Sequence, residues 1–279
     1  MAEPVQDVRA FALSTLAMPD TGNYATINPS FDHAIFNVSG CAPLAFEPYI
    51  WRFPIVGKVP YKGFFKEEDA IKEEEALKEL GLDVLRREVA GYSTLGYFKD
   101  PVLPSMLAYD DVALVDLIIH ELAHGVFYFK GQTQFNESFA NVVGHRGALL
   151  YFESVDGPDS PRAQEAIARK ADRALHVQHL LDLSEELDLL YKDDTFTPEE
   201  KAREKARLIQ GAQESYGDIP FSSAVYRGRT LPPLNNANLM SYRRYNSRPE
   251  LFDALLEEVD GDWGRFYDAL LALESEEDP

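Results

Sequence analysis

The feature that most constrains this chain is an apolar segment that carries two histidines and a glutamate. Residues 112–127 are apolar at almost every position, which is typical of a helix buried at the centre of a domain. His120, Glu121 and His124 lie within it as His-Glu-x-x-His, and Gly131 is expected to end the helix. Residues four positions apart share one helix face and are separated by about 6 Å along the axis. Both imidazoles can therefore reach one tetrahedral cation.

A second helix is expected to supply a third ligand. Residues 135–150 show helical periodicity, and Glu137 lies in their first turn as part of Asn-Glu-x-x-Ala. Two helices joined by so short a connection must pack antiparallel, which places Glu137 opposite His124. We expect His120, His124 and Glu137 to hold Zn²⁺, with a fourth position left for water.

The neighbouring polar residues have predicted roles as well. Glu121 is expected to be the general base that takes the proton of the water and delivers it to the leaving amine. Asn141 follows Glu137 by one helical turn and Asp116 precedes His120 by one turn, so each is a candidate to orient a ligating imidazole. A tyrosine or histidine normally supplies a further donor to the oxyanion. The candidates are Tyr216, Tyr226, Tyr242, Tyr245 and His145.

Several motifs carry a resemblance to known proteins. An HExxH motif followed by an NExxA glutamate resembles the gluzincin zinc peptidases. The chain more closely resembles a bacterial family described as predicted aminopeptidases, through WRFPIVGKVPYKGFF at 51–65, AGYSTLGYFKDPVL at 90–103, FNESFA at 135–140 and NNANL at 235–239. The resemblance implies a zinc metallopeptidase of aminopeptidase type with a gluzincin-like α+β body.

The resemblance also implies a substrate-binding strand. In the gluzincin peptidases, a strand just before the HExxH helix pairs with the backbone of the substrate. The segment GYSTLGY has strand character here, so Tyr92, Ser93, Thr94, Leu95 and Gly96 are the expected substrate-binding residues. An exposed strand edge is a template for an extended peptide. The same segment also fits a plain core strand with a glycine at a bulge.

The N-terminal part departs from the family pattern. Family members often carry a lipoprotein-type signal and a cysteine pair that flanks the FPxxG segment. This chain starts MAEPVQDVRAFAL and has Arg52 and Lys58 where those cysteines are expected. No signal peptide or membrane span is readable. We expect a cytoplasmic protein as the sequence stands, and a periplasmic or lipid-anchored one if the N-terminus has been trimmed.

Composition limits the partners. The net charge of −20 argues against nucleic acid or an anionic membrane, because both attract basic patches. A peptide substrate is the expected partner. Cys41 is the single cysteine of the sequence, which excludes an internal disulfide and a cysteine-based zinc site.

The pattern of elements predicts an α+β fold. Strand character at 24–27, 34–38 and 51–56 precedes the two motif helices, whereas the pattern after Asp156 is helical only. We therefore expect a metallopeptidase-like α+β part over residues 1–155, with the antiparallel pair of zinc-binding helices. A mostly helical C-terminal subdomain is expected over 156–279.

Two other functions remain open at this stage. One is a zinc-dependent hydrolase of a non-peptide amide that uses the same site. The other is a zinc-binding interaction protein whose catalysis has lapsed. The intact Glu121 argues against the latter, since a structural zinc site has a closed fourth position and needs no base.

Overall fold

A computed structural model describes residues 3–28, 35–53, 57–89, 99–129, 132–245 and 249–273. The described chain is α+β, mostly helical with a small antiparallel sheet. It divides into two compact units. Unit 1 comprises Met1–Asp32, Gly91–Ile167 and Tyr245–Pro279, and unit 2 comprises His33–Ala90 and Ala168–Arg244. These units interleave along the chain, and the expected boundary between residues 155 and 156 stays a prediction.

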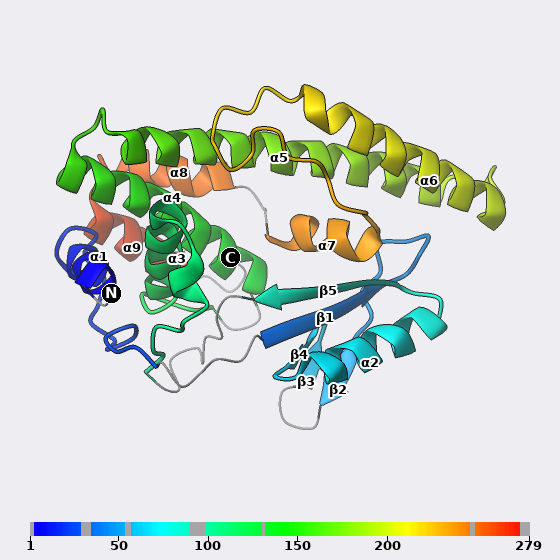
Figure 1. Cartoon of the computed structure of the whole chain (residues 1–279), viewed down its shortest axis with the longest axis horizontal. Coiled ribbons are helices and arrows are strands. Elements are labelled where there is room, and N and C mark those ends of the chain that lie inside the picture. The colour runs from blue at the N-terminus through cyan, green and yellow to red at the C-terminus, as the bar shows by residue number, and fades with distance from the viewer. Residues whose placement is uncertain are drawn as a thin grey trace. The chain divides into compact units, whose positions relative to one another are not determined.

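The described part of unit 1 is built from helices around one apolar core. Its elements are α1 (Glu3–Ser14), the 3₁₀ turn η1 (Met106–Ala108), α3 (Asp111–Ala123), α4 (Thr133–Asp156), the start of α5 (Pro161–Lys192), α8 (Pro249–Glu258) and α9 (Trp263–Ala272). Helix α3 packs against α4, α1 lies against α3, and α8 lies against α4 (Figure 1). Ile118, Phe139 and Phe266 are fully buried in this core. The two motif helices therefore lie at the centre of unit 1.

Helix α3 is shorter than the sequence pattern predicts. It starts where the side chain of Asp110 accepts a hydrogen bond from the amide of Ala113, and it ends at Ala123. The amides of Gly125 and Val126 donate to carbonyls three residues back, which closes the helix with tight turns. The expected helix end at Gly131 is therefore wrong, and His124 is the C-cap residue.

The sheets of the described chain belong to unit 2. Strand β1 (Ile35–Cys41) lies between β4 (Lys62–Phe64) and β5 (Asp83–Val89), and β2 (Trp51–Phe53) pairs with β3 (Gly57–Val59); all of these pairings are antiparallel. Helix α2 (Glu67–Glu79) packs on β1 and β5 and buries Ala70 and Leu77 (Figure 1). The strand expected at 24–27 is wrong, because that segment forms only an isolated bridge from Ile27 to Val102.

The helix-only pattern predicted after Asp156 is confirmed through residue 215. Helix α5 is followed by α6 (Pro198–Ser215), the 3₁₀ turn η2 (Tyr216–Asp218) and α7 (Asn236–Tyr245). Helix α6 begins with a capping box, in which the Thr197 side chain accepts from the Glu200 amide and the Glu200 side chain accepts from the Thr197 amide. Both backbone donors are satisfied at this helix start.

The NNANL motif has a structural role in unit 2. The side-chain amide of Asn236 is buried, donates to the carbonyls of Ala42 and Pro43, and accepts from the Tyr191 hydroxyl at 2.8 Å. The Asn235 side chain donates to the Val84 carbonyl at 2.9 Å. These hydrogen bonds connect the start of α7 to β5 and to the residues that follow β1. The two asparagines therefore join segments of unit 2 that are far apart in the sequence.

Candidate metal centre

Three of the predicted site residues converge in unit 1. His120 lies in the last turn of α3, His124 is its C-cap, and Glu137 lies in the second turn of α4. The Nε2 atom of His120 is 3.6 Å from one carboxylate oxygen of Glu137, and that of His124 is 3.8 Å from the other. One potential ligand atom from each side chain lies within 4.8 Å of the others.

This spacing fits a shared cation. Ligands at about 2.0–2.1 Å from a tetrahedral zinc ion are separated from each other by about 3.4 Å. The distances of 3.6 and 3.8 Å are close to that separation and longer than good hydrogen bonds. Two imidazoles and one carboxylate are a donor set that suits Zn²⁺. Within the described ranges, no other group of three His, Cys, Asp or Glu side chains meets the same test.

The two histidines differ in their affinity for a proton. Burial lowers the pKa of His120, but contact with Glu137 and the charges of Glu121 and Asp116 outweigh burial and raise it above its ordinary value. Burial, with the nearby charge of His120, lowers the pKa of His124 to about 4. As the pH falls, His120 therefore takes up a proton before His124 does. His120 is also one of the candidate metal ligands, so a proton and a cation would compete for it.

Glu121 lies beside these three residues and is partly buried. Burial raises the pKa of its carboxyl, and the negative charge of Glu137 raises it further, whereas His120 opposes the shift. The hydroxyl of Tyr24 donates to Oε2 of Glu121 at 3.4 Å. Burial also raises the pKa of Tyr24, so its hydroxyl keeps its proton and stays a donor.

Tyr24 is a site residue that the sequence analysis missed. It is fully buried and has a φ of 56°, which is uncommon for a residue other than glycine. Its amide donates to the Asp100 carbonyl at 2.6 Å, and its carbonyl accepts from the side chain of Gln6 at 3.2 Å. The Asp100 amide in turn donates to the side chain of Asn23 at 3.1 Å. These contacts hold the tyrosine in place, but no local pattern in the sequence indicates them.

The candidates for orienting a ligating imidazole lie near the centre with different contacts. An oxygen of Asp116 is 2.7 Å from Nδ1 of His145, and the charge of Asp116 also acts on His120. The Nδ1 atom of His124 is buried and has no hydrogen-bond partner in the described chain. Asn141 lies on α4 one turn after Glu137, as expected from its position. The orienting roles of Asp116 and Asn141 stay predictions.

The other predicted residues belong to different parts of the chain. The expected substrate-binding residues Tyr92, Ser93, Thr94, Leu95 and Gly96 fall outside the described residues. Of the oxyanion candidates, His145 belongs to unit 1 and contacts Asp116. Tyr216, Tyr226 and Tyr242 belong to unit 2, and the side chain of Tyr245 is not described.

Two glycines on α4 permit its close approach to α3. A Cβ atom at Gly144 would lie 2.5 Å from Oδ1 of Asp116 and 3.1 Å from Cβ of His120. A Cβ atom at Gly147 would lie 2.8 Å from the Ile119 side chain. Because any larger residue would push the helices apart, these glycines help to set the distance between the histidines and Glu137.

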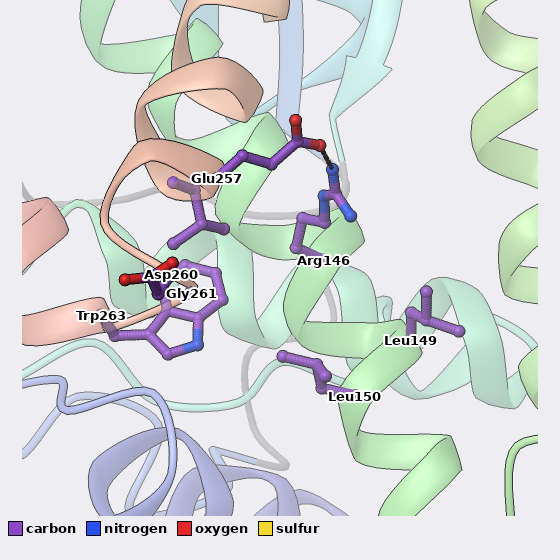
Figure 2. Close-up of a pocket in the computed structure, with 8 residues that line it drawn as sticks. Arg146, Leu149, Leu150, Glu257, Asp260, Gly261 and Trp263 are labelled. Carbon is purple, nitrogen blue, oxygen red and sulfur yellow. Dashed lines mark hydrogen bonds and ion pairs between the residues drawn. The ribbon is translucent and has the colours of Figure 1, made fainter.

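Unit 1 also contains a pocket away from these residues. It has a volume of about 390 Å³ and is lined by residues of α4, α8, the turn before α9 and the start of α9, among them Leu150 and Trp263. Figure 2 shows Arg146 reaching Glu257 across its lining, and Arg146 also bonds Asp253 at 2.7 Å. None of the metal-centre residues lines this pocket. It therefore does not add to the candidate site.

We predict that Gly144→Ala disturbs the centre through packing. The added methyl group must move Asp116 and His120, which should lower the free energy of unfolding by about 1–3 kcal/mol. Zn²⁺ affinity, measured by chelator competition, should fall as well. Gly211→Ala on α6 is the matched control, because a Cβ atom there meets nothing within 4 Å. An unchanged Zn²⁺ affinity in Gly144→Ala would show that this contact does not set the site.

A second prediction concerns pH. Because a ligating imidazole must lose its proton, Zn²⁺ affinity should fall by up to about tenfold per pH unit as pH drops through the raised pKa of His120. His124, with its pKa near 4, should stay neutral over the same interval. Titration calorimetry at several pH values, in two buffers of different ionisation enthalpy, measures both the affinity and the protons released. Equal affinity at pH 6 and pH 8 would contradict this assignment.

Comparison with protein-family models matches residues 2–279 to the family described as "Putative aminopeptidase". Comparisons with curated proteins and with solved structures gave no significant match. Across the described residues, every helix is too short or too polar to cross a membrane. The family match extends over nearly the whole chain and includes the histidines, Glu121 and Glu137. The chain therefore belongs to the putative aminopeptidase family.

Proposed function

We propose that the protein is a zinc-dependent peptidase of aminopeptidase type, with its reaction centre at His120, Glu121, His124 and Glu137. The observation that supports this most strongly is the convergence of three potential ligand atoms from two helices within 4.8 Å. The family description supports a peptide as the substrate class.

His120, His124 and Glu137 would hold the ion. Two neutral imidazoles and one carboxylate leave a net charge of about +1 on a bound divalent cation. When bound, Zn²⁺ supplies Lewis-acid chemistry, since it lowers the pKa of a coordinated water and polarises a carbonyl. The three side chains come from α3, its C-cap and α4, and the packing of these helices supports a ligand set formed by the fold.

Glu121 would move the proton. Its carboxyl lies beside the three ligands, and its raised pKa makes it a better proton acceptor than an exposed glutamate. In the proposed reaction it takes a proton from water and gives it to the leaving amine. The Tyr24 hydroxyl, 3.4 Å from Oε2, would fix the orientation of this carboxylate. Tyr24 thus acts as a positioning residue for Glu121.

The remaining residues have proposed roles around this centre. Asp116 would orient the ligand set through its charge near His120 and its contact with His145. Asn141 is a second candidate for orienting an imidazole. We retain residues 92–96, which lie outside the described residues, as the proposed contacts of the substrate backbone.

The two glutamates should respond differently to substitution. Glu137→Ala should lower the zinc content and the activity together, because it removes a proposed ligand. Glu121→Gln should retain near-full zinc by elemental analysis and lose about two to four orders of magnitude in peptide hydrolysis, because it removes only the base. Hydrolysis is measured by mass spectrometry on a peptide library with the purified, zinc-loaded protein.

Glu185→Gln, an exposed substitution on α5, serves as the control and should change neither quantity. Loss of metal from Glu121→Gln together with full metal in Glu137→Ala would show that the two roles are wrongly assigned. A zinc-loaded wild-type protein that cleaves no peptide in the library would contradict the peptidase proposal itself.

A further inference from the structure

Unit 2 contains a polar pocket whose lining includes none of His120, Glu121, His124 and Glu137. The pocket has a volume of about 220 Å³ and is lined by α5, α7 and the segment around residues 216–234. Arg173 and His176 on α5, with Arg229 and Tyr242, are among its lining residues. All of its lining residues belong to unit 2, so the pocket is defined within one compact part of the chain.

The two arginines of this pocket differ from several other basic side chains in their contacts with described acidic residues. The chain has 47 acidic and 27 basic residues. Basic side chains such as Arg86 and Lys205 form ion pairs with acidic side chains. In the described part of the chain, neither Arg173 nor Arg229 forms an ion pair with a carboxylate. Two guanidinium groups that form no ion pair with the described carboxylates therefore line one small pocket, in a protein that is acidic overall.

A hydrogen-bonded aromatic network lines the pocket together with these arginines. Nδ1 of His176 is 2.9 Å from the Tyr216 hydroxyl, and its Nε2 is 3.1 Å from the Tyr242 hydroxyl. Burial, followed by the charges of Arg229 and Arg173, lowers the pKa of His176 to about 4. The imidazole is therefore neutral near pH 7, with both nitrogens engaged, and the arginines carry the positive charge of the pocket.

The rest of the lining combines apolar surface with a polar amide. Leu180, Leu231 and Pro232 supply the apolar part. The Asn238 side chain accepts from the Asn235 amide at 3.0 Å, which fixes the orientation of its amide group. The ring of Tyr226 lies 5.5 Å from both the His176 ring and the Arg229 guanidinium. Cationic groups and apolar or aromatic surface thus occur together in one pocket.

We propose that this pocket binds a small organic carboxylate whose body is apolar or aromatic. Guanidinium groups form paired, charge-assisted hydrogen bonds with carboxylates, and the leucines and tyrosine rings would cover the apolar body. Inorganic phosphate shares the anionic chemistry but would leave the apolar wall in contact with water. The proposal goes beyond the peptidase function and does not depend on it.

A matched pair of ligands tests the anionic preference. N-acetyl-L-phenylalanine and its neutral amide differ in the carboxylate only. Titration calorimetry on the zinc-loaded full chain should show the acid binding at least about tenfold more tightly than the amide. Inorganic phosphate should bind more weakly than the acid. Equal binding of acid and amide, no binding of the acid, or tighter binding of phosphate would overturn the proposal.

Arginine substitutions then locate the site, since an acid can also bind at a metal ion. Arg173→Gln and Arg229→Gln should each weaken binding of the acid by about tenfold. Arg227→Gln is the matched control, because its guanidinium bonds the Ser222 carbonyl and does not line the pocket. Thermal unfolding followed by circular dichroism checks that each variant is folded. Unchanged binding in the first two variants, or an equal loss in the control, would overturn the assignment to this pocket.

Discussion

The close contact between α3 and α4 is the constraint on which the candidate centre depends. Glu137 near the start of α4 meets His124 at the end of α3, and Gly144 further along α4 meets Asp116 further back on α3. The two helices therefore run in opposite directions. Because two of the contact positions are glycines, the backbones approach closely enough for one carboxylate to face both imidazoles. Phe139 of α4 stacks on Phe266 of α9, with ring centroids 6.1 Å apart, in the same apolar core.

This arrangement brings like charges together in a partly buried place. Burial raises the pKa of Glu121, and repulsion from the negative charge of Glu137 raises it further. A proton on His120 relieves part of that repulsion, and a divalent cation would relieve more of it. The same electrostatics thus account for a carboxyl that accepts a proton readily and for a ligand set that favours a cation. Tyr24 adds a neutral donor, which satisfies Glu121 without adding charge.

The parts of this account that the sequence could predict are local. The spacing of the motif residues along the two helices predicts that two histidines and Glu137 come together, as the structure shows. The capping box at Thr197 is also local, because all of its members lie within four residues. Tyr24 could not be predicted, because its contact with Glu121 joins residues 97 positions apart and depends on tertiary packing. The end of α3 at Ala123 was also missed, since apolar residues continue past the tight turns that close the helix. The pocket of unit 2 could not be predicted either. Its lining residues, from Arg173 to Tyr242, are far apart in the sequence, and several lie in loops that show no periodic pattern.

The central claim is that His120, His124 and Glu137 bind one divalent metal ion while Glu121 does not. Anomalous diffraction at the zinc absorption edge, from crystals of the zinc-loaded protein, tests it most directly. The account predicts a single ion about 2.0–2.2 Å from Nε2 of both histidines and from one carboxylate oxygen of Glu137, with Glu121 outside the coordination sphere. Zinc bound elsewhere, or bound by Glu121 in place of Glu137, would contradict it.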